Sequence, residues 1–442
     1  MYIKIIQFLI FKKVEFEMKV AIFTDTFIPQ TNGVVKSICN KIKELSKRGI
    51  EVIVFAPGKT THMEYYCGAR VYFFKSQSLN FYPEYLLADF GEVYMKSFTL
   101  LEMEKPDVYH VEDPFVIGFV GITYAQKFKK PLIGTYHTYY EEYAAHLSKG
   151  RYRRLMRYLF GKTSWPYITV FFNSCGTTIA PGNGIAEILK KHKIKNVKVI
   201  PNGIDFSLVR NKKRYDIRKL HGIPKNAKLI LHLGRISFEK KIEILLKAFI
   251  ELYDKNTYLV IVGDGPSLKD YQRIAKDLNI KNIVFTGYVN DEYIASYYNS
   301  ADIFATSSDT EICPMVVLEA FAAGKPVVGP DYLGVNDLII NNFNGLKFKT
   351  GDYIDMAMKL SLLLKNKKMR NLLGKNAKRF SEKYSVEKTI GYLIDVYKNT
   401  KPKNFRLREL IVFWPKLNIS QINYIKNHKL VKYLKCIKSR FY

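Results

Sequence analysis

Two glutamates with a defined spacing are the side chains in this sequence best suited to hold a polar ligand. Glu311 and Glu319 lie in TEICPMVVLEAFAAGKPVV, a segment that predicts a loop, the start of a helix and then a buried strand. Carboxylates accept hydrogen bonds from hydroxyl groups such as those of a sugar, and a helix N-terminus attracts phosphate. The alternative interpretation is one solvated glutamate and one that caps the helix.

Two cations follow a predicted strand in the same half of the chain. Arg235 ends the strand LILHLGR, and Lys240 comes five residues later. Two positive side chains just beyond a strand edge suit a diphosphate, because each can neutralise a negative charge. Either one alone is equally typical of a protein surface. The next strand ends in the tight turn GDGP, where Gly263 lets the backbone approach a ligand or a neighbouring loop.

The first half of the chain offers a glycine loop and a histidine. Gly33 lies in the loop PQTNGV between the first strand and a helix, where backbone N–H groups can face a phosphate. This loop is not a G-x-G-x-x-G motif, so a dinucleotide site is not indicated. His137 ends the predicted strand PLIGTYH, where a polar side chain either points into a cleft or is capped.

Alternating strands and helices must position these groups. The strands predicted in the first half are 19–25, 51–57, 108–112, 131–137, 167–174 and 198–205, with helices over 36–48 and 117–129. The second half repeats the pattern, with strands at 229–235, 257–265, 283–289, 301–308 and 325–331 and a helix over 241–253. The fold class is therefore α/β, with one doubly wound domain over 18–203 and another over 204–400. Ligands of such sheets lie beyond the carboxyl ends of the strands, and two such edges can face one cleft.

Charge and cysteine content restrict the setting. The 442 residues carry a net charge of +30, which predicts an anionic partner such as nucleic acid, an acidic bilayer or phosphates, unless it reflects a lysine-rich proteome. The five cysteines are scattered, which argues against a disulfide framework or a zinc site and fits a reducing cytoplasm. Residues 1–17 are interpreted as a start-site artefact or an interfacial segment. Residues 401–442, with eleven Lys or Arg and one Glu, are interpreted as a basic amphipathic tail.

The motifs, taken in order, resemble the large retaining glycosyltransferase family numbered four, whose GT-B architecture has two Rossmann-like domains facing a cleft. The resemblance covers about residues 19–398 and rests on the Gly33 loop, PNGID (201–205), GR-x4-K (234–240), GDGP (263–266), FTGYV (285–289) and the pair Glu311 and Glu319. The sequence departs from the family where Ile312-Cys313-Pro314 follows the first glutamate and where Leu333-Gly334 replaces a pair of glycines.

The resemblance implies a role for each matched residue. Arg235 and Lys240 would bind the donor diphosphate, with Gly33 pressing against it from the other domain. Glu319 would bind the ribose and Glu311 the hexose. Their implied neighbours in the donor site are Gly263 and Gly287, and the implied catalytic set is His137, Arg235, Lys240 and Glu311. The sequence has no D-x-D motif, so neither a metal nor a cofactor is expected, and the UDP-sugar is a substrate.

The segment YHTYYEEYAAHL (136–147) is similar to the His-x-x-Tyr-x-x-Tyr stretch of bacterial diacylglycerol glycosyltransferases, with matches at His137, Tyr140 and Tyr143. The basic segment 149–162 follows, with six cations and no acid. On a helix, its Arg153, Arg154 and Arg157 would face away from the apolar side, as in an interfacial helix, although a solvated helix has the same pattern.

These resemblances imply transfer of glucose or galactose from a UDP-sugar to 1,2-diacylglycerol with retention. The partners would be a nucleotide sugar, diacylglycerol and an anionic membrane surface. No RNA-binding pattern is present, so no nucleic acid is expected. The expected location is cytoplasmic, peripheral on the inner face of the cell membrane. The alternatives are a GDP-mannose-dependent α-mannosyltransferase acting on phosphatidylinositol or a cell-wall glycan and, more distantly, an epimerase or phosphorylase of the same architecture.

Overall fold

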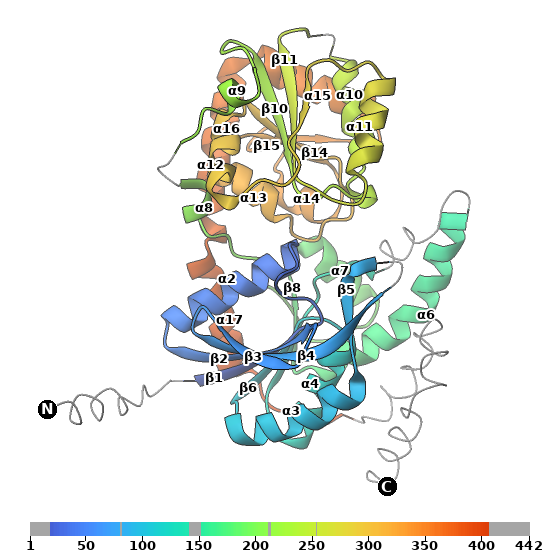
Figure 1. The fold of residues 1–442 in the computed structure, drawn as a ribbon, viewed down its shortest axis with the longest axis vertical. Helices are drawn as coiled ribbons and strands as arrows, with labels where there is room; N and C mark the ends of the chain where they lie inside the picture. Colours follow the sequence, from blue (N-terminus) through green and yellow to red (C-terminus); the bar gives the residue numbers. More distant parts are fainter. Residues whose placement is uncertain (1–17, 80–81, 141–151, 211–213, 253, 406–442) are drawn as a thin grey trace, which may run out of the picture.

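Two parallel-sheet domains make up the protein, one above the other in Figure 1. The computed structural model describes residues 18–79, 82–140, 152–210, 214–252 and 254–405. The predicted segments 1–17 and 406–442 therefore lie outside the described residues, as do Tyr143 and the first part of the basic segment.

The first domain contains a nine-stranded sheet in the order β3-β4-β2-β1-β6-β7-β8-β9, with β5 paired to β4. Its strands are β1 (Met18–Phe23), β2 (Ile50–Gly58), β3 (His62–Tyr66), β4 (Ala69–Leu79), β5 (Tyr82–Ala88), β6 (Val108–Val111), β7 (Leu132–Thr135), β8 (Thr177–Ala180) and β9 (Val197–Val199). The described helices of this half are α2 (Gly33–Lys47), α3 (Phe90–Glu104), α4 (Val116–Lys127), α6 (Tyr152–Ser174) and α7 (Asn183–Lys191). All pairs are parallel except β3–β4 and β4–β5, so the strand order reverses between β1 and β6.

The second domain has a six-stranded parallel sheet in the order β12-β11-β10-β13-β14-β15. The strands are β10 (Lys228–Leu233), β11 (Thr257–Val262), β12 (Ile283–Phe285), β13 (Ile303–Ala305), β14 (Val327–Pro330) and β15 (Gly345–Phe348). Short helices α8 (Ser207–Arg210) and α9 (Ile217–Leu220) precede it. Its helices are α10 (Ile242–Ile250), α11 (Leu268–Asp277), α12 (Asp291–Ser300), α13 (Met315–Ala322), α14 (Leu333–Leu338), α15 (Tyr353–Lys365) and α16 (Lys367–Ser381), with 3-10 turns at Phe238–Lys240 and Glu382–Tyr384. Here the order reverses between β10 and β13, so each sheet has one switch point at which a doubly wound fold binds its ligands.

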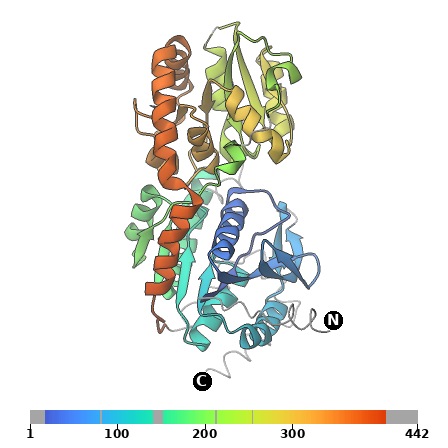
Figure 2. The ribbon, with the colours of Figure 1, turned by 90° about the vertical axis from the view of Figure 1, so that its left-hand side faces the viewer.

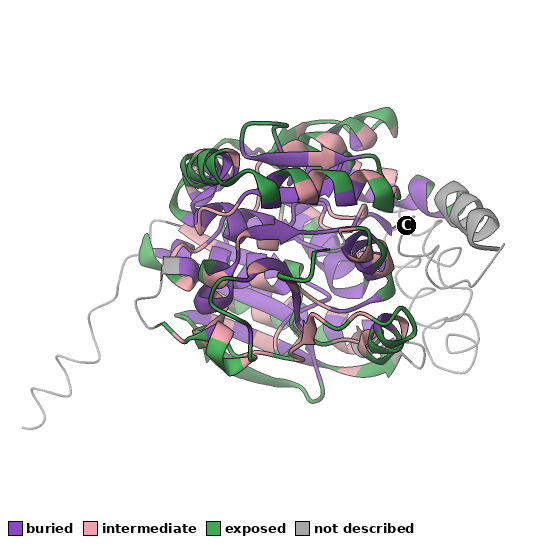
Figure 3. Cartoon of the chain, turned by 90° about the horizontal axis from the view of Figure 1, so that it is seen from above, coloured by how far each residue is buried: buried purple, intermediate pink, exposed green. Residues whose placement is uncertain are grey.

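Buried residues follow the strands of both sheets, and exposed residues lie on the outer faces of the helices (Figure 3). This two-domain α/β architecture confirms the predicted fold class. Among the residues that the structure describes, no helix is both long enough and apolar enough to cross a bilayer.

One predicted strand is wrong. Residues 167–174, which carry β-branched and aromatic side chains, form the end of helix α6. The buried side chains Tyr167, Ile168, Phe171 and Phe172 recur at helical spacing against the first-domain core. Strand propensity reflects fit to a half-buried pleated surface, and here packing against this core overrides it. The strand of this region is β8, which directly follows the helix.

The last described helix, α17 (Val386–Asn399), returns from the second domain to the first, as Figure 2 shows. Its side chains Val386, Ile390, Leu393, Val396 and Tyr397 belong to the hydrophobic cluster that includes strands β1 and β2 and helix α2. The predicted range 204–400 thus includes a helix whose buried face completes the core of the first domain. The chain passes between the domains twice, near Ile204 and near Tyr384. These two crossings are hydrogen-bonded to each other, because Ile204 donates to the Tyr384 carbonyl at 2.9 Å and Val386 donates to the Ile204 carbonyl at 3.0 Å.

Candidate active site

The glycine loops at the carboxyl ends of β10, β11 and β12 lie against one another. The Gly263 N–H donates to the Gly287 carbonyl at 3.0 Å, and the Gly234 N–H donates to the Val262 carbonyl at 3.0 Å. Gly263 has a φ of +134°, and a Cβ there would come within 1.9 Å of the Gly234 carbonyl oxygen. The structure therefore brings the predicted donor-site residues Gly263 and Gly287 together beside the loop that carries Arg235.

Lys240 and Glu311 form an ion pair at the switch point of the second sheet. Lys240 Nζ lies 2.5 Å from Glu311 Oε1. Burial alone would lower the pKa of Lys240, but the charges of Glu311 and Glu239 raise it, whereas the neighbouring charge of Arg235 acts against them. Lys240 is therefore a cation at neutral pH. The structure thus brings Lys240 and Glu311 together.

The Glu311 loop is held by the start of α14. The Gly334 N–H donates to the Glu311 carbonyl at 2.9 Å, and a Cβ on Gly334 would come within 2.0 Å of the Ile312 carbonyl oxygen. Only glycine fits this approach at position 334.

Glu319 lies one turn into α13 and is 1% exposed. Its Oε2 accepts a hydrogen bond from the Tyr298 hydroxyl at 2.9 Å. Its Oε1 pairs with the ammonium of Lys36, which lies on α2 of the first domain, three residues after Gly33. A Cβ built on Gly33 meets nothing within 4 Å, so the space above this predicted phosphate contact is open. Residues of both domains thus meet at Glu319.

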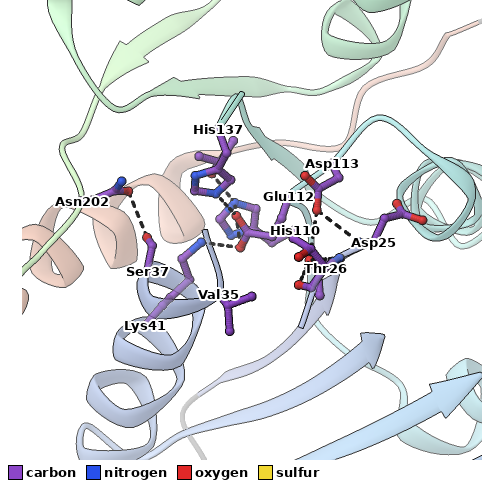
Figure 4. A network of polar contacts seen from close by, with 12 residues as sticks. Asp25, Thr26, Val35, Ser37, Lys41, His110, Glu112, Asp113, His137 and Asn202 are labelled. Atoms are coloured by element: carbon purple, nitrogen blue, oxygen red, sulfur yellow. Dashed lines mark hydrogen bonds and ion pairs between the residues drawn. The ribbon is translucent and has the colours of Figure 1, made fainter. Parts of the chain in front are cut away.

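A buried network in the first domain holds His137 (Figure 4). Glu112 is fully buried, and its Oε2 lies 2.7 Å from His137 Nε2. Its Oε1 pairs with the Lys41 ammonium and lies 3.7 Å from His110 Nε2. Burial would raise the pKa of Glu112, but His110, Lys41 and His137 together lower it, so it is ionised and only accepts hydrogen bonds. The Nε2 of His137 therefore carries the proton that points to Glu112.

Two aspartates lie at the switch point of the first sheet. Asp113 Oδ2 accepts from the Asp25 N–H and the Thr24 hydroxyl, both at 3.1 Å. The Asp25 carboxylate accepts from the Ile117 N–H at 2.9 Å and the Gly118 N–H at 3.2 Å, so it holds the start of α4. Burial, followed by the charge of Asp113, raises the pKa of Asp25 to about 8, against the opposing effect of the backbone hydrogen bonds.

Four residues of the site were not predicted from the sequence, namely Glu112, Asp113, Asp25 and Lys36. The first three directly follow β6 and β1, the two strands between which the order reverses. A search for polar residues just beyond those strand ends would have found them. Lys36 has no such signal, because its partner lies in the other domain.

The predicted acceptor residues are described only in part. Tyr140 is buried in the core of the first domain, and its ring meets Phe115 edge-on at 5.6 Å. Residues Arg153, Arg154 and Arg157 lie on helix α6, but nothing is described of their side chains. The side chains that the structure describes include no cluster of three or more His, Cys, Asp or Glu that could hold a metal ion.

The structure has the GT-B fold of the solved glycosyltransferases that it matches. The structure matches sucrose-phosphate synthase from Thermosynechococcus elongatus with a TM-score of 0.71 at 18% identity, covering 86% of this chain and 98% of that one. It matches Anabaena HepE, solved in complex with UDP-glucose, with a TM-score of 0.67 at 19% identity, covering 86% of this chain and all of that one.

Sequence comparison identifies the family. Residues 31–208 match the family described as Glycosyltransferase Family 4, and residues 213–380 match that described as Glycosyl transferases group 1. The chain is 31% identical over 342 residues to the alpha-monoglucosyldiacylglycerol synthase of Streptococcus pneumoniae, covering 74% of each. It is 29% identical over 345 residues to a GDP-mannose-dependent alpha-mannosyltransferase of Corynebacterium glutamicum, covering 76% of this chain and 78% of the relative. The chain therefore belongs to glycosyltransferase family 4.

Proposed function

We propose that this glycosyltransferase transfers glucose or galactose from a UDP-sugar to 1,2-diacylglycerol with retention, which yields a monoglycosyl diacylglycerol. The observation that carries the proposal is the pairing of Lys240 with Glu311 after the strands of the second sheet, together with Glu319 in the helix that follows, which contacts Lys36 of the first domain. This arrangement offers cations for a diphosphate and carboxylates for sugar hydroxyls. The choice of acceptor draws on the relative from Streptococcus pneumoniae and on the His137–Tyr140–Tyr143 spacing.

The proposed reaction is a front-face displacement. The bond between C1 of the hexose and the phosphate oxygen breaks while C1 bonds to the acceptor hydroxyl oxygen, and the leaving diphosphate takes the hydroxyl proton. Arg235 and Lys240 stabilise the charge that develops on the diphosphate. Glu112, the carboxylate nearest to His137 in the described network, is fully buried and paired with Lys41. We therefore assign it to holding His137 and not to forming a covalent sugar intermediate.

The test is incubation of the enzyme with labelled UDP-glucose, UDP-galactose and GDP-mannose on vesicles that contain diacylglycerol or phosphatidylinositol. Lipid extraction should recover label from a UDP-sugar on diacylglycerol, and NMR of the product should show the donor's α configuration. Label from GDP-mannose on phosphatidylinositol would instead favour the second candidate, which the relative from Corynebacterium glutamicum supports. Absence of label from every lipid would reject both lipid acceptors.

Transfer should be insensitive to chelators. The residues proposed to neutralise the diphosphate are Arg235 and Lys240, so a divalent ion has no assigned task. Rates measured after treatment with EDTA on washed vesicles should stay within about twofold of the untreated rates, since an ion that neutralised the leaving group would contribute far more. A strict need for added Mg²⁺ or Mn²⁺ would contradict this donor site.

We further propose that the basic segment 149–162 docks the enzyme on an anionic bilayer, because diacylglycerol stays in the membrane. Each cation near such a surface contributes about 1 kcal/mol, within a Debye length. Replacing Arg153, Arg154 and Arg157 by glutamate should therefore abolish co-sedimentation with phosphatidylglycerol vesicles and lower transfer at low salt.

The matched control replaces Lys190, Lys191 and Lys195 by glutamate, which makes the same change in net charge at exposed positions of the same domain. This control should bind vesicles nearly as the parent does. Equal binding by the arginine variant and the parent would mean that the segment is a solvated helix face. The tail 401–442 is a second candidate contact.

A further inference from the structure

We propose that Lys36 of the first domain is a third cation of the donor site and binds the diphosphate of the nucleotide sugar. This inference rests on the proposed function, because it takes Glu319 as the ribose-binding residue. Lys36 lies outside the motifs on which the family resemblance rests. The geometry around Glu319 points to it.

The two carboxylate oxygens of Glu319 have partners in different domains. Its Oε2 is occupied by the Tyr298 hydroxyl of its own domain at 2.9 Å, and burial together with the charge of Glu319 raises the pKa of Tyr298 well above normal. Tyr298 therefore remains protonated and keeps donating. The Oε1 pairs with Lys36, whose side chain is 34% exposed against 2% for Glu319. Oε1 is therefore the oxygen that a ribose hydroxyl would contact, and Lys36 covers it.

Helix α2 is fixed so that Lys36 faces the second domain. The Asn32 side chain caps the helix by accepting from the Val35 N–H at 2.9 Å. On the same side of the helix, the Ser37 hydroxyl donates to Asn202 Oδ1 at 2.9 Å and the Asn40 side-chain amide donates to the Gly203 carbonyl at 3.2 Å. These contacts hold the first turn of α2 against the segment that joins the domains.

The charges of the site require a further cation once the donor binds. Without Lys36, the described cations are Lys240, which is already paired with Glu311, and Arg235, whose charge acts on Lys240, while Glu319 has no cation and a diphosphate adds two negative charges. A ribose hydroxyl that takes over Glu319 Oε1 displaces an ammonium on a flexible four-carbon stem. Because the diphosphate is joined to the ribose, the released ammonium lies beside new negative charge and pairs with it. Lys36 thus neutralises Glu319 before the donor binds and pairs with the diphosphate afterwards.

The test is titration calorimetry of the full chain with UDP and with GDP, in the absence of acceptor. Lys36→Met should weaken binding of the nucleotide that the parent binds by about tenfold or more, as for loss of a charge-assisted hydrogen bond. Lys36→Arg should recover most of the affinity. Lys43→Met, at an exposed position of the same helix, is the control and should bind as the parent does.

Uridine and guanosine contain the ribose but lack phosphate. Their binding therefore distinguishes a contact between Lys36 and the diphosphate from an effect of Lys36 on Glu319. Lys36→Met should leave their affinity unchanged or slightly increased. An equal loss for nucleoside and nucleotide, or no loss for either in the folded variant, would overturn the inference while leaving the proposed function standing. If the parent itself binds neither diphosphate, the proposed function fails and the inference fails with it.

Discussion

Replacing Glu319 by alanine is expected to lower kcat/KM for the donor by about 10³-fold, because a site built to bind sugar hydroxyls loses the carboxylate that accepts from them. The fold should persist, since α13 packs through its apolar residues. The buried Tyr298 hydroxyl loses its 2.9 Å partner, which should lower the free energy of unfolding by about 1–3 kcal/mol. Labelled-lipid assays and denaturant unfolding measure the two effects.

Glu319→Gln refines this expectation. The amide keeps an acceptor oxygen for Tyr298 but loses the charge that pairs with Lys36, so stability should recover while transfer remains impaired. Glu251→Ala, at an exposed position of the same domain, should behave as the parent does. Near-normal transfer by folded Glu319→Ala would remove this residue from the donor site.

Lys240→Met should reduce kcat by about 10²–10³-fold with a smaller effect on KM, because the charge on the leaving diphosphate increases as the bond to the sugar breaks. Methionine keeps the apolar length of the side chain and removes only the ammonium, which lies 2.5 Å from Glu311. Arg235→Ala should have a comparable effect. Steady-state kinetics with varied donor concentration separate kcat from KM.

A double-mutant cycle tests whether Lys240 acts on the donor or only on Glu311. If Lys240 merely positioned Glu311, then Lys240→Met would cost little in a Glu311→Gln background. We expect a large loss in both backgrounds. Lys247→Met, at an exposed position of α10, provides the control, and a Lys240 variant as active as this control would refute the assignment.

Local patterns were sufficient to predict much of the site. Arg235 and Gly263 closely follow strands whose apolar runs are plain in the sequence, Glu311 lies in the loop after another such strand, and parallel strands bring their carboxyl ends to one edge. Glu319 was placed correctly in the first part of a helix. The one wrong strand, 167–174, has residues that suit a strand, and its helical burial became visible only in the packed core.

Local sequence patterns could not predict contacts between residues that are far apart in the chain. Lys36 and Glu319 are 283 residues apart and come from different domains, so no periodicity links them. The support for His137 comes from Glu112, next to one strand, and Lys41, on a helix, with His110 nearby. Each of these residues alone looks like an ordinary strand-end or helix residue. Their joint burial around one carboxylate defines the network.

The paired crossings between the domains constrain how the enzyme moves. Because Ile204 is hydrogen-bonded to both Tyr384 and Val386, the two connections between the domains are fastened to each other, and we expect them to bend together. A chimera that exchanges the donor half must keep α17 with the acceptor half, whose core it completes.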